Sequence, residues 1–285
     1  MNWGVHCDWN PLTDVLVSTP EHYVWLPNCA VARHTMDSGG QLDRQQALSQ
    51  HEALRQRLAS LGARVHAVPP SADLPDLSFT RDTTAMTPWG LLSCRMSEAE
   101  RSAEVRYVED YVCSLGVPLW HRTRAGSLEG GDICMLRPGL VVIGVGGDRT
   151  SMEGAMEASD AFAAEGWEVR RYRYDAYFLH LDTFFCLAAQ DLALACTDII
   201  EDEFLDWLGR IGITLIPISF KEMRRLGANI LALGDGQVLS SSQNRRANAA
   251  MAEHGLRVHE VDVSQFALGG GGIHCLTMPL ARAHA

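Results

Sequence analysis

One pattern recurs five times along this chain of 285 residues: a segment with helical patterning ends at a glycine, and a β-rich strand follows at once. A glycine after the last helical turn commonly adopts the left-handed conformation that closes the helix. The glycines lie 43 to 54 residues apart, and they are Gly62, Gly116, Gly166, Gly212 and Gly255. Five units of similar size indicate an α/β fold built from internal repeats. An ordinary α/β protein would also alternate helices and strands, so the period alone does not separate the two.

Each unit also carries a polar residue 13 to 20 positions after its glycine, where a second strand is expected to begin. These five residues are Asp82, Glu129, His180, Asn229 and Cys275. If the units surround one axis, their polar residues converge at one end of it. We also expect a first strand over residues 12–19 and a short closing strand directly after Cys275.

A run of glycines, 269–272, leads through Ile273 and His274 to Cys275. Glycine lacks a Cβ atom, so this backbone can adopt positive φ and pass close to another group. A thiol at the end of such a loop is within reach of a small molecule, which favours a nucleophile. Free cysteine is also among the most buried residue types, so a structural role in the core is the alternative.

Three carboxylates, those of Asp82, Glu129 and Asp182, are expected near His180 and Cys275. Such charges repel one another unless a cation lies between them. Hard metals such as Mg²⁺ and Ca²⁺ are candidates, but cysteine is a poor ligand for them. A planar guanidinium matches carboxylates through its fixed N–H donors. The set favours a guanidinium whose carbon Cys275 attacks, with His180 as acid and base.

Composition and charge exclude several other classes of protein. The net charge of −11 argues against a nucleic-acid or anionic-membrane surface, and no apolar run reaches the length of a membrane helix. The eight cysteines include no C-x-x-C pair, so zinc-ligand spacing is missing. The N-terminus does not look like a signal peptide, and we expect a cytoplasmic protein. Residues 1–285 are expected to form one domain, in which residues 20–40 look irregular and could form a lid.

Four motifs in this order resemble the guanidino-group modifying superfamily: F-T-R-D-T-T (79–84), E-G-G-D (129–132), H-L-D-T (180–183) and G-G-G-I-H-C (270–275). That superfamily comprises arginine deiminases, dimethylarginine hydrolases and arginine amidinotransferases. The resemblance spans nearly the whole chain. It implies the pentein fold, a five-bladed α/β propeller of five pseudo-repeated helix–strand units.

The resemblance also implies roles for individual residues. Cys275 would be the nucleophile, His180 the general acid and base, and the three carboxylates the guanidinium ligands. Five further residues would bind the rest of the substrate: Arg101 and Arg149 as clamps for an α-carboxylate, and Asp76, Phe79 and Gly130. A solvated helix charge pairing with Glu98 or Glu104 is the alternative for Arg101. The expected partner is a small cationic guanidino compound, with no metal or organic cofactor, and homo-oligomer formation stays open.

Within the superfamily, F-T-R-D-T-T and H-x-D resemble arginine deiminases, and Glu129 resembles the hydrolases in general. The leading hypothesis is therefore hydrolysis of arginine or a close derivative to a ureido product and ammonia, through an S-alkylthiouronium intermediate. His274 resembles amidinotransferases instead, although strand alternation predicts that its side chain points away from Cys275. Asp76 stands where deiminases tend to carry Asn, and the deiminases' helical insertion is missing. Amidinotransferase, dimethylarginine dimethylaminohydrolase and a non-catalytic pentein are the alternatives.

Overall fold

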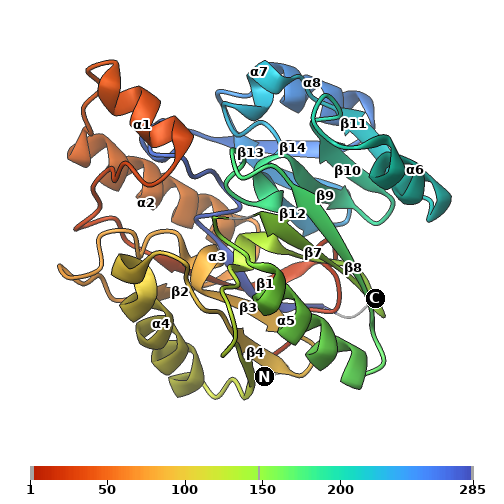
Figure 1. The fold of residues 1–285 in the computed structure, drawn as a ribbon. Coiled ribbons are helices and arrows are strands. Elements are labelled where there is room, and N and C mark those ends of the chain that lie inside the picture. The colour runs from red at the N-terminus through yellow and green to blue at the C-terminus, as the bar shows by residue number, and fades with distance from the viewer. Residues whose placement is uncertain (1–2, 147, 284–285) are drawn as a thin grey trace.

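Five small three-stranded sheets surround a common centre, with the longer helices on the outside (Figure 1). The structure, a computed structural model, describes residues 3–146 and 148–283. The sheets are, in strand order, β15 (Met278–Arg282), β1 (Leu12–Ser18) and β2 (Arg64–Val68); β3 (Thr84–Thr87), β4 (Gly90–Ser93) and β5 (Leu119–Arg122); β6 (Ile133–Arg137), β7 (Leu140–Gly146) and β8 (Glu168–Tyr174); β9 (Phe185–Ala189), β10 (Leu192–Ala195) and β11 (Thr214–Pro217); β12 (Leu231–Gly234), β13 (Gln237–Ser241) and β14 (Arg257–Val261).

Every sheet has the same internal arrangement, which confirms the predicted five-fold repeat and the five-bladed α/β propeller. The middle strand pairs antiparallel with one neighbour and parallel with the other. Parallel strands need a crossover connection, and one helix supplies it in each unit. These helices are α2 (Arg44–Ser60), α4 (Ser102–Ser114), α5 (Met152–Ala164), α6 (Asp202–Arg210) and α8 (Arg245–Glu253).

The remaining helices are short and lie in the connections. They are α1 (Ala30–Asp37), α3 (Thr80–Thr83), α7 (Phe220–Met223), α9 (Ser264–Ala267) and the 3₁₀ turns η1 (Ala99–Arg101), η2 (Gly130–Asp132) and η3 (Leu181–Thr183). Helix α1 corrects the expectation that residues 20–40 are irregular throughout. It forms because the Cys29 sulfur accepts a hydrogen bond from the Ala32 amide at its N-terminus, which the sequence pattern did not reveal. Among the described residues, no helix is both long and apolar enough to cross a bilayer.

The five repeat glycines all follow their helices in the left-handed conformation, with φ between 79° and 94°. Each lies one residue beyond the C-cap of its helix, at Leu61, Leu115, Glu165, Ile211 and His254. A Cβ atom on any of the five would meet nothing within 4 Å. These positions therefore require glycine because of the backbone angle, and not because of space.

Replacing Gly62 by alanine should lower the free energy of unfolding by about 1–2 kcal/mol, because an L-residue resists positive φ. Gly209 is the matched control, since it lies inside α6, has no positive φ and also has open space around it. Gly209→Ala should raise stability by about 0.5–1 kcal/mol through helix propensity. Urea denaturation of both variants measures the difference. Equal effects at the two sites would contradict the helix-closing role of Gly62.

The two ends of the chain meet in one sheet. Strand β1 lies between β15 and β2, so the last strand of the chain pairs with the first. Val15, Leu16 and Val17 of β1 are fully buried. The predicted first strand is confirmed over Leu12–Ser18, whereas the closing strand begins at Met278 and not directly after Cys275. Turn hydrogen bonds, from the Leu276 amide to Gly272 and from the Thr277 amide to His274, take up the residues between.

Candidate active site

The five repeat-equivalent polar residues lie at or just before the start of five strands, as the repeat predicted. Asp82 is in α3 before β3, Glu129 precedes η2 and β6, and His180 precedes η3 and β9. Asn229 precedes β12, and Cys275 precedes β15. All five are buried, with exposed fractions of 4% or less. They form two groups of residues in contact, one around His180 and one around Cys275.

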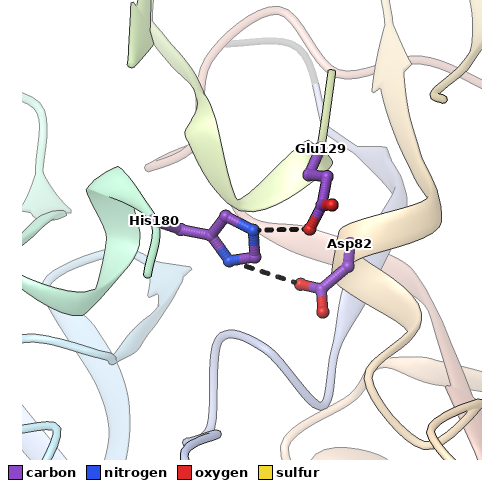
Figure 2. A group of neighbouring side chains, drawn as sticks. All are labelled: Asp82, Glu129 and His180. Carbon is purple, nitrogen blue, oxygen red and sulfur yellow. Dashed lines mark hydrogen bonds and ion pairs between the residues drawn. The ribbon is translucent and has the colours of Figure 1, made fainter. Parts of the chain in front are cut away.

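His180 lies between two carboxylates (Figure 2). Its Nε2 atom is 2.8 Å from Oε2 of Glu129, and its Nδ1 atom is 3.8 Å from Oδ1 of Asp82. Burial by itself would lower the pKa of His180, but the charge of Asp82 and the hydrogen bond to Glu129 outweigh it and raise the pKa to about 9. The side chain of His180 is therefore a positively charged imidazolium at neutral pH.

Glu129 is held in place from two sides. The backbone amide and the hydroxyl of Ser97 both donate to its Oε1 atom, at 3.1 and 3.2 Å, while Oε2 faces His180. Burial would raise the pKa of this carboxyl, yet the hydrogen bond and charge of His180 lower it to about 2. Glu129 and His180 thus form a buried ion pair across the neutral range.

The thiol of Cys275 contacts an amide and a carboxylate. Nδ2 of Asn229 lies 3.1 Å from the sulfur, and Oδ2 of Asp182 lies 3.7 Å from it. Burial, followed by the charges of Asp182 and Asp82, raises the pKa of Cys275 well above its usual value. The thiol is therefore protonated at neutral pH.

Asn229 is a site residue to which sequence reasoning assigned no role, although its repeat position pointed to it. Its Oδ1 atom accepts from the backbone amides of His274 and Cys275, at 2.9 and 3.3 Å. A Cβ atom on Gly272 would collide with this side chain, so the glycine run is what lets Asn229 come this close. Asn229 thus holds the segment that carries the thiol.

Three buried polar atoms of these two groups have no hydrogen-bond partner among the described residues: Asp182 Oδ1, Asp82 Oδ1 and His180 Nδ1. The last two lie 3.8 Å apart. Buried polar atoms are normally paired, so these atoms are suited to bind a polar ligand. Asp82, Glu129 and His180 offer atoms within 4.8 Å of one another, close enough for a metal ion. A metal would have to displace the proton of His180. A cation with N–H donors would fit the two carboxylates without that cost.

Arg101 is buried among carboxylates, which differs from its predicted role as a carboxylate clamp. Its Nη1 atom donates to Asp82 Oδ2 at 2.6 Å, and Nε and Nη2 donate to Glu104 at distances from 2.9 to 3.3 Å. Nε is also 3.9 Å from Asp76. The pairing with Glu104 was the alternative considered from the sequence, but it is buried and not solvated. With its donors used in this way, Arg101 orients Asp82 and leaves no fork for a substrate carboxylate.

Arg149 lies between the His180 group and an open pocket. Its Nη2 atom donates to the Asn28 carbonyl at 2.7 Å, and Nη1 is 3.9 Å from Glu129 Oε2. The pocket has a volume of about 420 Å³ and is lined by Asn28, Cys29, Ala30, Arg33, Ser97, Glu98, Asp148, Arg149, Ala176, Tyr177 and Leu179. Three of these residues, 28–30, and Arg33 belong to the predicted lid segment. Arg149 therefore contacts both the His180 group and this pocket.

The other predicted substrate-binding residues pack around this region. Asp76 is buried and accepts a hydrogen bond from Nδ2 of Asn28 at 2.9 Å. Phe79 packs edge-on against Tyr23, and a Cβ atom on Gly271 would collide with its ring. Gly130 lies against the Arg81 carbonyl, so its role in the structure is close backbone packing.

Strand alternation predicted that the side chain of His274 points away from Cys275. The structure shows that it does not. Its Nδ1 atom is 2.8 Å from Asp182 Oδ2, the same oxygen that lies 3.7 Å from the Cys275 sulfur. The physical reason is that residues 274 and 275 lie in a turn ahead of β15, where alternation does not hold. Both side chains therefore face Asp182.

Comparison with known proteins places these residues in a family. The model of the eukaryotic N,N dimethylarginine dimethylhydrolase family matches residues 27–282. The uncharacterized protein YkgA of Bacillus subtilis is 29% identical over 236 residues, which cover 83% of this chain and 80% of YkgA. An arginine deiminase of Listeria monocytogenes is 26% identical over 255 residues, which cover 73% of this chain. The match spans only 62% of that deiminase.

Solved structures share the fold. Dimethylarginine dimethylaminohydrolase from Pseudomonas aeruginosa, in complex with citrulline, superposes with a TM-score of 0.80 at 24% identity, covering 94% of this chain and 99% of that one. The N-terminal domain of ArgZ, an arginine dihydrolase from cyanobacteria, gives a TM-score of 0.81 at 21% identity, covering 96% and 98%. The pentein fold expected from the motifs is thereby confirmed. By the extent of the family match, the chain belongs to the N,N-dimethylarginine dimethylhydrolase family within the guanidino-group modifying superfamily.

Proposed function

We propose that the chain is a cysteine-dependent guanidino hydrolase that converts arginine, or a close arginine derivative, to a ureido product of the citrulline type and ammonia. The observation that carries the proposal is that Asp182 and Asp82, the two carboxylates whose charges act on the Cys275 thiol, each keep one buried oxygen, Oδ1, without a hydrogen-bond partner among the described residues. A guanidinium placed between the two oxygens would donate an N–H to each and present its carbon to the sulfur. The arginine deiminases of Listeria among the relatives support the same chemistry.

Binding of the cation would activate the nucleophile. The pKa of Cys275 is raised by burial and by Asp182 and Asp82, so a positive charge between these carboxylates would lower it again. The thiol then gives its proton to water, and the thiolate forms a bond to the guanidinium carbon. The reaction is thereby coupled to the presence of substrate, because the free thiol stays protonated.

His180 would carry the protons of both half-reactions. Its Nδ1 atom has no hydrogen-bond partner among the described residues and lies 3.8 Å from Asp82 Oδ1, while Nε2 is held by Glu129. In the first half, Nδ1–H donates its proton to the departing amine and the C–N bond breaks. Ammonia departs, and an S-alkylthiouronium remains on Cys275. In the second half, the neutral Nδ1 accepts a proton from water. The water oxygen bonds to the same carbon and keeps its second proton. As the C–S bond breaks, that proton passes to the sulfur, which restores the thiol, and the ureido product leaves.

Dimethylarginine is the second candidate substrate, favoured by the family model that matches residues 27–282. We give preference to unsubstituted guanidines because Asp182 Oδ1 is a buried acceptor that needs an N–H donor. Methyl groups facing that oxygen would leave it unpaired, at a cost of about 1–3 kcal/mol. We therefore expect kcat/KM for arginine to exceed that for asymmetric dimethylarginine by about 5- to 150-fold. Equal values for the two would contradict this assignment.

Mass spectrometry of products formed in ¹⁸O-water tests the reaction itself. Arginine is supplied alone and together with glycine, ornithine or hydroxylamine. Hydrolysis predicts one ¹⁸O in the ureido product at a rate that the amines barely change. A requirement for an amine, with a new guanidino product, would identify an amidinotransferase, for which the His274-Cys275 pair is the favouring observation. Activity that persists in a chelator would support the expectation that no metal takes part.

Arg149 provides a test of how the outer end of the substrate is held. Arg149→Ala should lower kcat/KM for arginine about 10- to 150-fold, the value of one charge-assisted contact. Agmatine lacks the α-carboxylate and should lose much less. Arg33→Ala is the matched control. Arg33 lines the same pocket, but its side chain is exposed and donates to the Pro27 carbonyl. Equal losses for arginine and agmatine would show that Arg149 is structural.

Four expectations stay predictions at this point. They are a cytoplasmic location, assembly into homo-oligomers, one domain over residues 1–285, and a moving lid over residues 20–40. Hydrogen bonds that anchor the lid segment include those from Trp25 Nε1 to the Gln265 carbonyl, from Asn28 Nδ2 to Asp76 and from Arg149 Nη2 to the Asn28 carbonyl. Opening of the pocket would have to break the second of these.

A further inference from the structure

His274 and Cys275 contact the same oxygen atom. Oδ2 of Asp182 lies 2.8 Å from Nδ1 of His274 and 3.7 Å from the sulfur of Cys275. The second oxygen of this carboxylate, Oδ1, is buried and has no partner among the described residues. One oxygen of Asp182 is therefore occupied by His274, and the other is available to a ligand.

This arrangement bears directly on the thiol. A carboxylate oxygen 3.7 Å from a sulfur opposes formation of a thiolate, and the pKa of Cys275 is raised partly for that reason. A hydrogen bond donated to that oxygen withdraws charge from it and weakens the repulsion. The same bond stops the carboxylate from rotating, so that Oδ1 stays directed away from the imidazole.

The imidazole is suited to this role as a neutral donor. Burial and the charge of Arg81 lower the pKa of His274, so Nδ1 carries the only ring proton when it bonds to Asp182. The hydrogen bond from His274 in turn lowers the pKa of Asp182 against the effect of burial. Behind the pair lies an inner cavity whose lining includes Asp8, Cys134, Cys186 and Arg282. Asp182 and His274 both line this cavity.

We propose that His274 is a positioning residue: its Nδ1–H bond to Asp182 shields Cys275 from that carboxylate and directs the free oxygen toward the substrate guanidinium. The proposal rests on the proposed function for its substrate half, but its effect on the thiol needs no substrate. The other charged groups that face the pair are Arg81, Asp8, Asp82 and His180, and the variants below leave all of them in place.

Two substitutions separate the hydrogen bond from the bulk of the ring. His274→Leu keeps a side chain of similar size and removes the donor. His274→Asn places an amide N–H near the position of Nδ1 and keeps the donor. His66→Leu is the matched control, because His66 makes a comparable contact, Nε2 to Asp14 Oδ1 at 2.8 Å, on β2.

The first measurement is the rate of alkylation of Cys275 by iodoacetamide between pH 7 and 10, read from the mass of the Cys275 peptide without any substrate. We expect His274→Leu to alkylate about 10-fold or more slowly than wild type at each pH. His274→Asn and His66→Leu should stay close to wild type. The second measurement is kcat/KM for arginine, which His274→Leu should lower by about 10- to 100-fold and His274→Asn should largely retain.

Alkylation of a folded His274→Leu protein at the wild-type rate would overturn the proposal. So would a His274→Asn protein as impaired as His274→Leu, because the effect would then come from the ring and not from the donor. If His274→Leu fails to fold, His274→Gln takes its place, since its amide extends beyond the Nδ1 position. If no guanidino compound is turned over but the alkylation rates separate as expected, the proposed function fails while the role of His274 stands.

Discussion

Cys275→Ala is expected to abolish turnover of arginine, with a loss of about 10⁴-fold or more, because no other group can form the bond to the guanidinium carbon. The sulfur lies between Asn229 and Asp182 at the buried end of the site, which no other described cysteine shares. The substitution removes one heavy atom from a buried side chain, so the thermal midpoint should change little. Steady-state assays and thermal melts measure the two effects.

The covalent intermediate gives this prediction an independent readout. Wild-type protein mixed with arginine and quenched in acid should carry an amidino adduct on the Cys275 peptide, which mass spectrometry detects. Cys113→Ala is the control, because Cys113 lies half-buried in α4 and has no contact with the site. Appreciable turnover by Cys275→Ala, or an adduct on another cysteine, would remove Cys275 from its proposed role.

Glu129→Gln should lower kcat/KM by about 10²- to 10³-fold, because Glu129 is one of the groups that keep His180 protonated in a buried site. The direction of the pH effect follows from the pKa of His180, about 9. Wild-type activity needs a proton on His180, so it should fall as the pH rises through about 9. In Glu129→Gln, burial still disfavours the imidazolium form of His180, and the carboxylate charge that opposed this effect is gone. The pKa of His180 should therefore fall, and the same loss of activity should begin at lower pH.

A pH profile of kcat/KM between pH 5 and 10 measures this shift. Glu157→Gln is the matched control, since Glu157 also pairs with a histidine, His121, at 3.1 Å, but at a partly buried position. Its profile should match that of wild type. An alkaline limb that stays near pH 9 in Glu129→Gln would show that Glu129 binds substrate without setting the protonation of His180.

Local features of the sequence predicted much of the fold because their physical causes are local. A helix that ends in a left-handed glycine needs only the residues around that glycine, and all five such glycines have the expected φ. The position of a polar residue at the start of a strand is likewise a matter of spacing. Convergence of Asp82, Glu129, His180 and Cys275 followed once the five units were taken to surround one axis. The motifs then supported the family that the comparisons show.

Side-chain contacts between blades could not be predicted from local features of the sequence. Arg101 was expected to face a substrate carboxylate, and it is buried against Asp82 and Glu104 instead. Asn229 was placed by the repeat, but its bonds to the sulfur and to two amides of the glycine segment depend on how close two blades lie. A shift of a few ångströms, which no spacing along the chain specifies, decides whether such side chains meet.

The sequence by itself therefore determined the five-fold repeat, the glycine closures and the residues that face the centre, because these depend on backbone preference and periodicity. Only the tertiary structure decided how the side chains pair there. His274 illustrates the reason: alternation predicted that it points away from the thiol, but the chain turns at residues 273–277 before β15 begins. That turn places His274 and Cys275 on the same oxygen of Asp182, a residue 92 positions earlier than His274 in the chain.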